Sequence, residues 1–255
     1  MRLPEGERWL IDRLLDGGAG PRPAPATVVA VTPSVGGAGA STLAVTLSLL
    51  AAQRGMTVTL VDGDSRGGGL DVLLGAEDAA GARWSEFAQV RGRLAPAALE
   101  QALPQVQGVR LLSADRGSDG LPSGACATVI AAAERCSDLV VIDLPRDGEL
   151  PSTLLPLCSR AVLVATNHVR SAAAASAAAR WIELQCPDIR VVLRHDPRGV
   201  SPDAVADALA PRTVTRVPHS SALPKRANAG DPPSVRDAYA KECSRLLDRL
   251  VSGES

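Results

Sequence analysis

The sequence predicts an α/β fold with a doubly wound, mostly parallel sheet and helices on both faces. Short runs rich in β-branched residues alternate with Ala- and Leu-rich stretches along most of the 255 residues, a pattern typical of βαβ units. Several of these runs are apolar throughout, as expected for strands that are covered on both faces. A glycine-rich segment separates the first predicted strand of this region from its first helix.

The individual elements follow from this alternation. The predicted strands, in chain order, are Thr27–Val31, Val58–Val61, Val109–Leu112, Leu139–Ile142, Ala161–Ala165, Arg190–Leu193 and Thr213–Val217. The predicted helices are Ser41–Gln53, Ala125–Arg135, Ser171–Leu184, Pro202–Leu209 and Val235–Val251. The last helix carries an apolar stripe that we expect to lie in the core, formed by Val235, Tyr239, Cys243, Leu246 and Leu250.

The chain divides into three parts. Residues 1–26 are expected to form a helix over Leu3–Asp16 and then a linker rich in Gly and Pro. Residues 27–251 form the single α/β domain, and residues 252–255 are a short tail. The N-terminal helix is too short to fold alone, so we expect it to pack on the main domain or to belong to an upstream module.

Charge and apolar patterning limit the classes of partner. Lys and Arg number 27 against 28 Asp and Glu, and the net charge of -1 disfavours nucleic acid as a partner. No apolar run approaches the roughly 18 residues of a membrane span, and the N-terminal segment lacks the hydrophobic region of a signal peptide. We therefore expect a cytoplasmic protein. Peripheral membrane contact through the last helix is disfavoured by its acidic residues Asp237, Glu242 and Asp248.

The segment Val31–Leu43, VTPSVGGAGASTL, is the most informative part of the sequence. Its glycines allow backbone N–H groups to converge on an anion at the start of a helix. Ser41 or Thr42 then offers a hydroxyl where phosphate-binding loops hold magnesium. A glycine-rich turn without a ligand is the alternative. The residues expected to form the nucleotide-binding loop are Gly36, Gly37, Ala38, Gly39, Ala40, Ser41 and Thr42.

Carboxylates follow two other predicted strands. Asp62 and Asp64 end the strand in TVTLVDGDSRGGG, and Asp143 ends the strand in DLVVIDLP. Because the carboxyl ends of parallel strands meet at one edge of a sheet, these groups are expected beside the glycine loop, where they can hold magnesium and water. The alternative for each is an aspartate that caps a following helix.

The set GGAGAST, LVDGDSRGGGLDVLLG and DLVVIDLP resembles the MinD/ParA group of deviant P-loop ATPases, most closely the CpaE/TadZ-like branch and the septum-site-determining proteins of actinobacteria. The resemblance covers about Thr27 to Val251. It implies ATP or ADP with magnesium as cofactors and a homodimer that depends on nucleotide. It also implies protein partners in a division or pilus/secretion (Tad/Flp-type) machinery, with recruitment to the poles or the septum.

The resemblance implies roles for the matching residues. Asp64 matches the aspartate associated with the attacking water, and Asp143 matches the Walker B aspartate. The magnesium ligands would be Ser41, Asp62 and Asp143. Pro218 matches the part of the family site that borders the base. Arg194 stands where the family often has the asparagine that reads adenine.

Two lysines of the family pattern are missing. Val35 stands in place of the signature lysine, Ala40 stands in place of the ordinary P-loop lysine, and the chain has lysine only at Lys225 and Lys241. A hydrogen bond to a charged group contributes about 1.5–3 kcal/mol, so loss of the ordinary P-loop lysine weakens nucleotide binding about 10- to 150-fold. We expect weak binding or none and negligible hydrolysis. Replacement of the lysines by an arginine such as Arg66 stays open.

Three classes of function compete. A nucleotide-binding positioning or scaffold protein for septum placement or pilus/secretion assembly is favoured. An active ParA-like ATPase in DNA segregation is the alternative, and the charge balance and the missing lysines count against it. A nitrogenase-reductase-like enzyme or a tyrosine autokinase on the same fold is disfavoured because the chain has no CxxC pair and Tyr239 is its single tyrosine.

Overall fold

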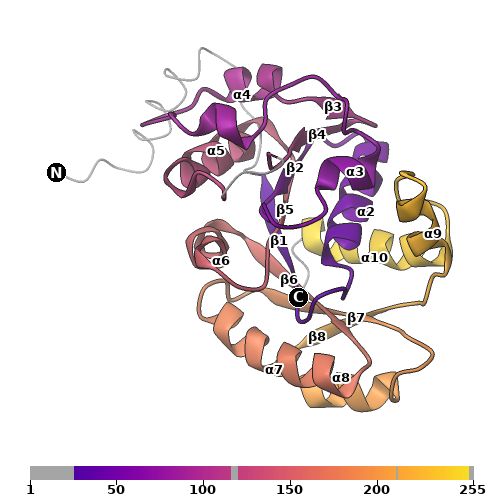
Figure 1. The fold of residues 1–255 in the computed structure, drawn as a ribbon. Helices are drawn as coiled ribbons and strands as arrows, with labels where there is room; N and C mark the ends of the chain where they lie inside the picture. Colours follow the sequence, from indigo (N-terminus) through magenta and orange to yellow (C-terminus); the bar gives the residue numbers. More distant parts are fainter. Residues whose placement is uncertain (1–25, 116–119, 211, 253–255) are drawn as a thin grey trace.

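Apolar strands that alternate with helices assemble into one eight-stranded sheet with helices on both sides (Figure 1). This computed structural model describes residues 26–115, 120–210 and 212–252. The predicted α/β fold, doubly wound and mostly parallel, is confirmed. The helix expected over Leu3–Asp16, the linker up to residue 25 and the last three residues of the chain lie outside the described residues.

The order of strands across the sheet is β3-β4-β2-β5-β1-β6-β7-β8. All neighbours are parallel except β3 and β4, which are antiparallel. All seven predicted strands are confirmed, with small shifts at their ends. The strand bounds are β1 (Thr27–Pro33), β2 (Val58–Asp62), β3 (Gln105–Val106), β4 (Val109–Leu112), β5 (Leu139–Asp143), β6 (Arg160–Thr166), β7 (Ile189–Arg194) and β8 (Thr213–Val217).

The two faces of the sheet carry separate hydrophobic cores, because successive side chains of a strand point to opposite faces. In β1, Val28 and Ala30 belong to one core, whereas Val29 and Val31 belong to the other. The first core is covered by α4 (Pro96–Ala102), α5 (Ser123–Cys136), α6 (Glu149–Leu154), α7 (Val169–Glu183) and α8 (Pro202–Leu209). The second core is covered by α2 (Ala40–Gln53), α3 (Leu70–Leu74) and α10 (Ala238–Ser252).

All five predicted helices are present, as α2, α5, α7, α8 and α10. The elements that the sequence did not indicate are short: β3, α3, α4, α6, α9 (Ala222–Asn228) and the 3₁₀ helices η1 (Trp84–Phe87) and η2 (Leu155–Leu157). They span two to seven residues, which is too short to show a helical or strand period.

The apolar stripe of α10 lies in the second core, as predicted. Tyr239, Cys243, Leu246 and Leu250 are all buried. Val235 precedes the helix and packs against the same core. Within the described ranges, no helix is both long enough and apolar enough to cross a membrane.

Candidate functional site

The three sequence motifs meet at the carboxyl edge of the sheet. Strand β5 lies between β1 and β2, so the loop after β1 and the carboxylates that end β2 and β5 share this edge. Asp62 is directly opposite Asp143 in the register of β2 and β5. Val31 of β1 pairs with Asp143 from the other side. This is the edge at which parallel α/β sheets bind their ligands.

The loop that joins β1 to α2 has a backbone that requires glycine. Gly37 and Gly39 have φ angles of 74° and 100°, a region that other residues rarely adopt. Gly39 also occupies the N-cap of α2 and offers no capping side chain, so first-turn N–H groups stay available to an anion. Gly36 and Gly37 are exposed, whereas Ala38 and Ala40 are buried.

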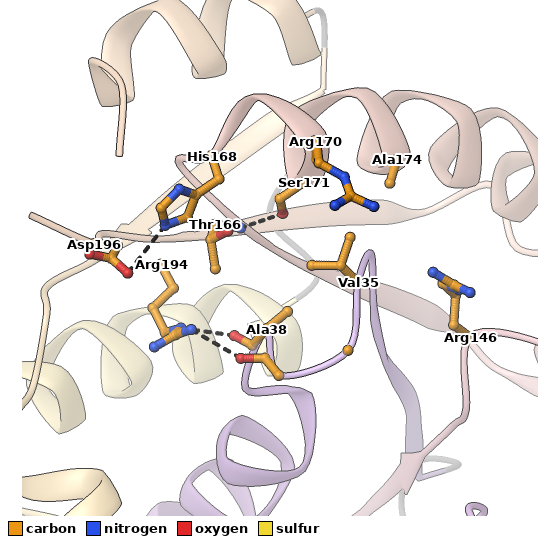
Figure 2. Close-up of a pocket in the computed structure, with 12 residues that line it drawn as sticks. Val35, Ala38, Arg146, Thr166, His168, Arg170, Ser171, Ala174, Arg194 and Asp196 are labelled. Carbon is orange, nitrogen blue, oxygen red and sulfur yellow. Dashed lines mark hydrogen bonds and ion pairs between the residues drawn. The ribbon is translucent and has the colours of Figure 1, made fainter. Parts of the chain in front are cut away.

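Arg194 at the end of β7 is attached to this loop. Its Nε donates to the carbonyl of Ala38 at 2.9 Å, and its Nη2 donates to the carbonyl of Gly37 at 3.0 Å (Figure 2). These two bonds join segments more than 150 residues apart in the chain. The guanidinium therefore fixes the loop conformation and places a positive charge against it.

Ser41 and Asp143 form the inner corner of the site. The Ser41 hydroxyl donates a hydrogen bond to the Asp143 carboxylate. Burial, together with repulsion from the carboxylates of Asp62 and Asp64, raises the pKa of Asp143 to about 7, although the Ser41 bond lowers it. A cavity of about 260 Å³ lies in front of this corner, lined by residues that include Ser41, Asp64 and Asp143.

Asp62 organises the loop that follows β2. Its Oδ1 accepts from the Asp64 amide at 3.1 Å, and its Oδ2 accepts from the Leu70 amide at 3.1 Å. The Ala114 amide bonds to the same carboxylate. Burial nevertheless raises the pKa of Asp62. The buried indole of Trp84 donates to the Asp62 carbonyl at 2.7 Å. Hydrogen bonds to both the carbonyl and the carboxylate of Asp62 therefore fix the end of β2.

The chemistry of this corner fits magnesium. Within the described part of the chain, no three His, Cys, Asp or Glu side chains gather closely enough to hold a metal ion by themselves. Magnesium typically needs only one or two protein ligands and takes water and phosphate oxygens for the rest. The Ser41 hydroxyl and the carboxylates of Asp62 and Asp143 supply oxygen ligands, which magnesium prefers. Burial raises the pKa of both carboxyl groups, so a bound cation would stabilise their charged form.

A larger cavity, of about 580 Å³, also borders the glycine loop and shares Gly36 and Arg146 with the smaller one. Ser34 before the loop contacts Ser171 of α7, with the two hydroxyl oxygens 3.0 Å apart. The Thr166 amide donates to the same Ser171 oxygen at 2.8 Å. Figure 2 shows this cavity, with loop and α7 on facing sides. Its lining residues are Val35, Gly36, Gly37, Ala38, Arg146, Thr166, His168, Arg170, Ser171, Ala174, Arg194 and Asp196.

Other predicted positions lie at the margin of these cavities. Pro218 follows β8 at the same sheet edge, beside Arg194, whose register partner is Val217. Thr42 lies in the first turn of α2, and Arg66 is exposed in the loop after β2. None of the three is among the lining residues of the two cavities.

Sequence reasoning missed two arginines of the larger cavity, Arg146 and Arg170. Arg146 comes three residues after Asp143, and Arg170 is the second residue of the Ala-rich helix α7. The one available signal was composition: the chain has 27 Lys and Arg, of which only Lys225 and Lys241 are lysines. A site that needs positive charge at this edge must therefore take it from arginine.

Comparison with known proteins gives one group of relatives by sequence. No protein-family model matches this chain. The uncharacterized protein Rv3660c of Mycobacterium tuberculosis strain H37Rv is 37% identical over 267 residues, a match that covers 99% of this chain and 73% of the relative. Its counterpart MT3760 in strain CDC 1551 matches to the same extent.

Solved structures share the fold. The MinC:MinD cell division complex of Aquifex aeolicus matches with a TM-score of 0.75 at 20% identity, over 90% of this chain and 97% of that one. A ParA family ATPase of Chlorobium tepidum gives 0.74 at 14% identity, over 87% and 97%. The septum site-determining protein MinD of Pyrococcus horikoshii, complexed with Mg-ADP, gives 0.72 at 18% identity, over 88% and 96%. The chain therefore has the fold of the MinD/ParA P-loop ATPases.

Proposed function

The chain belongs to the same family as the Mycobacterium tuberculosis protein Rv3660c, and on that premise we propose that it is a cytoplasmic positioning or scaffold protein that binds nucleotide and hardly hydrolyses it. Within the MinD/ParA group we place it in the CpaE/TadZ-like branch. Its partners are proteins of a division or pilus/secretion machinery, which recruit it to the septum or the poles.

One observation carries the proposal: the glycine loop and the Ser41–Asp143 contact are present, but both positions of the family lysines are apolar. The glycine loop has its left-handed residues Gly37 and Gly39, and Ser41 is bonded to Asp143. Val35 and Ala40 supply no charge. Backbone amides and magnesium still support binding, whereas an arginine that stabilises the transition state contributes about 10³- to 10⁵-fold in rate. Turnover therefore suffers far more than binding.

The site residues divide the work of holding such a ligand. Ser41 and Asp143 would hold magnesium, which when bound neutralises charge on the phosphate oxygens. Asp62 is the third proposed ligand, and its bonds to amides also fix the loop that carries Asp64. Asp64 lines the cavity beside Ser41, where it would face water. Without a lysine, we expect that water to react very slowly.

Protein partners are proposed from the kind of neighbour that shares the fold. The Aquifex aeolicus MinD structure is a complex with MinC. For this chain we propose an analogous arrangement, in which a nucleotide-bound homodimer presents a surface to a partner protein. The near balance of acidic and basic residues, with a net charge of -1, gives no general attraction to DNA.

Deletion of the gene, with complementation, tests the proposed role. Septum positions are measured by membrane staining, and pilus assembly and secretion are measured in the same cells. We expect misplaced septa or lost pilus/secretion assembly, restored by the wild type and not by Asp143→Ala. The exposed Asp78→Ala is the matched control and should restore function. Normal septa, pili and secretion in the deletion strain would overturn the proposed role.

A further inference from the structure

Arginine side chains line the larger cavity beside the glycine loop, whereas the loop itself has no charged side chain. Three arginines from three elements line it: Arg146 after β5, Arg170 in the first turn of α7 and Arg194 at the end of β7. Val35, in the position of the missing signature lysine, lines the same cavity. Figure 2 shows Val35 below the side chain of Arg170, with Arg146 on the right of both.

Arg194 is already engaged, because its guanidinium bonds to the carbonyls of Gly37 and Ala38. Arg146 bonds to the exposed carboxylate of its neighbour Asp147 at 2.6 Å and 2.9 Å. It also lines the smaller cavity in front of Ser41 and Asp143. Arg146 therefore borders both the proposed magnesium corner and the larger cavity.

Arg170 differs from both. It is exposed, and its guanidinium forms no hydrogen bond or ion pair with any residue that the structure describes. Its place is nevertheless fixed, because the next residue, Ser171, bonds to the Thr166 amide and contacts Ser34 at the entry to the glycine loop. An arginine held at the edge of a cavity without a carboxylate partner is free to bind an anion.

One carboxylate lines the same cavity, and its charge is compensated. Asp196 bonds to the Arg198 amide at 2.9 Å and to the Arg198 guanidinium, and it pairs with His168 at 3.2 Å. These contacts hold the pKa of Asp196 well below its usual range. Among the described residues, the partners of the Asp196 carboxylate are therefore Arg198 and His168, and not Arg146 or Arg170.

We propose that Arg170, assisted by Arg146, binds the phosphate chain of a nucleoside di- or triphosphate in this cavity and supplies the positive charge that Val35 and Ala40 lack. The proposal rests on the proposed nucleotide binding and names the residues that make it possible. Arginine suits the task because its planar fork can donate two parallel bonds to one phosphate. Phosphate binding would also join α7 to the glycine loop.

The test is calorimetric titration of the full chain with ATP, ADP, tripolyphosphate and adenosine. We expect Arg170→Ala to weaken binding of ATP and tripolyphosphate about 10- to 150-fold. Arg170→Lys should lose less affinity, because lysine keeps the positive charge but not the planar guanidinium. Arg146→Ala should also weaken binding. Arg180→Ala, an exposed arginine of the same helix outside the cavity, should bind like the wild type.

A second readout separates ligand contact from a structural effect. In the wild type, ATP should slow hydrogen exchange at residues 168–174, and Arg170→Ala should abolish that protection while melting at the wild-type temperature. Unchanged affinity for ATP and tripolyphosphate in Arg170→Ala would overturn the inference and leave the proposed function standing. If the wild type binds tripolyphosphate but not ATP, and Arg170→Ala loses tripolyphosphate binding, Arg170 binds an anion, but both the nucleotide part of the proposed function and the nucleotide as ligand of this cavity are overturned.

Discussion

Asp62 and Asp143 face each other in register at the ends of β2 and β5, and both are buried. Neither carboxylate has a lysine or arginine bonded to it among the described residues. Burial raises the pKa of both, that of Asp143 to about 7. Two buried acids without a counterion favour protonation or a bound cation.

This pair predicts how stability depends on pH. The pKa of Asp143 is higher in the folded state than its unfolded value of 3.8, so the folded state holds a proton that the unfolded state has lost. The contribution of Asp143 to the free energy of unfolding is therefore most favourable below about pH 4, and it falls as the pH rises to about 7. Denaturant unfolding without magnesium should show this fall in the wild type and a smaller one in Asp143→Asn.

At pH 8, Asp143→Asn should exceed the wild type in free energy of unfolding by more than about 1 kcal/mol, because the amide does not bury a charge. Asp78→Asn, at an exposed aspartate, is the control and should change little. If Asp143→Asn proves less stable than the wild type at pH 8, the raised pKa of Asp143 is wrong.

Arg194 is predicted to fix the glycine loop. Arg194→Ala removes two hydrogen bonds to the carbonyls of Gly37 and Ala38. We expect a loss of about 1–3 kcal/mol in free energy of unfolding and faster hydrogen exchange at residues 36–40. The comparison is Arg216→Ala, which removes a surface ion pair with Asp203 and should cost less than about 1 kcal/mol. Equal effects of the two variants would contradict the role of Arg194.

Trp84 is predicted to stabilise the end of β2. Trp84→Phe keeps an aromatic ring in the core but removes the indole bond to the Asp62 carbonyl. We expect the free energy of unfolding to fall by about 1–3 kcal/mol, measured with urea. Trp181→Phe alters a partly exposed tryptophan of α7 and should change stability by less than about 0.5 kcal/mol. No loss of stability in Trp84→Phe would show that this bond is unimportant.

Ala40→Lys is predicted to tighten ATP binding without restoring hydrolysis. A lysine here can add one charge-assisted bond to phosphate, worth about 1.5–3 kcal/mol. Ala40 itself is buried in the second core, so its side chain must leave that core to reach phosphate. Thermal melting should accompany the titration, and Ala40→Met provides a control of similar length without charge. ATP binding that is equal in Ala40→Lys and Ala40→Met would contradict the prediction.

The sequence predicted the strands and long helices well because their apolar patterns extend over enough residues to show a period. It also indicated that the glycine loop, Asp62 and Asp143 would share one edge of the sheet, because each is at the carboxyl end of a parallel strand. The contacts of Arg194 with the glycine loop and the place of Arg170 could not be predicted. They depend on how β7 and α7 pack against a loop more than 130 residues earlier, and local pattern carries no information on such contacts.

The central claim is that this protein holds nucleotide without turning it over. Calorimetric titration of the wild type with Mg-ATP, in parallel with a phosphate-release assay at saturating ATP, tests it most directly. We predict measurable binding that requires magnesium and is lost in Asp143→Ala, with phosphate release no faster than in a sample of Asp143→Ala. Sustained phosphate release that depends on Asp64 and Asp143 would contradict the account, because it would show that another residue fully replaces both lysines.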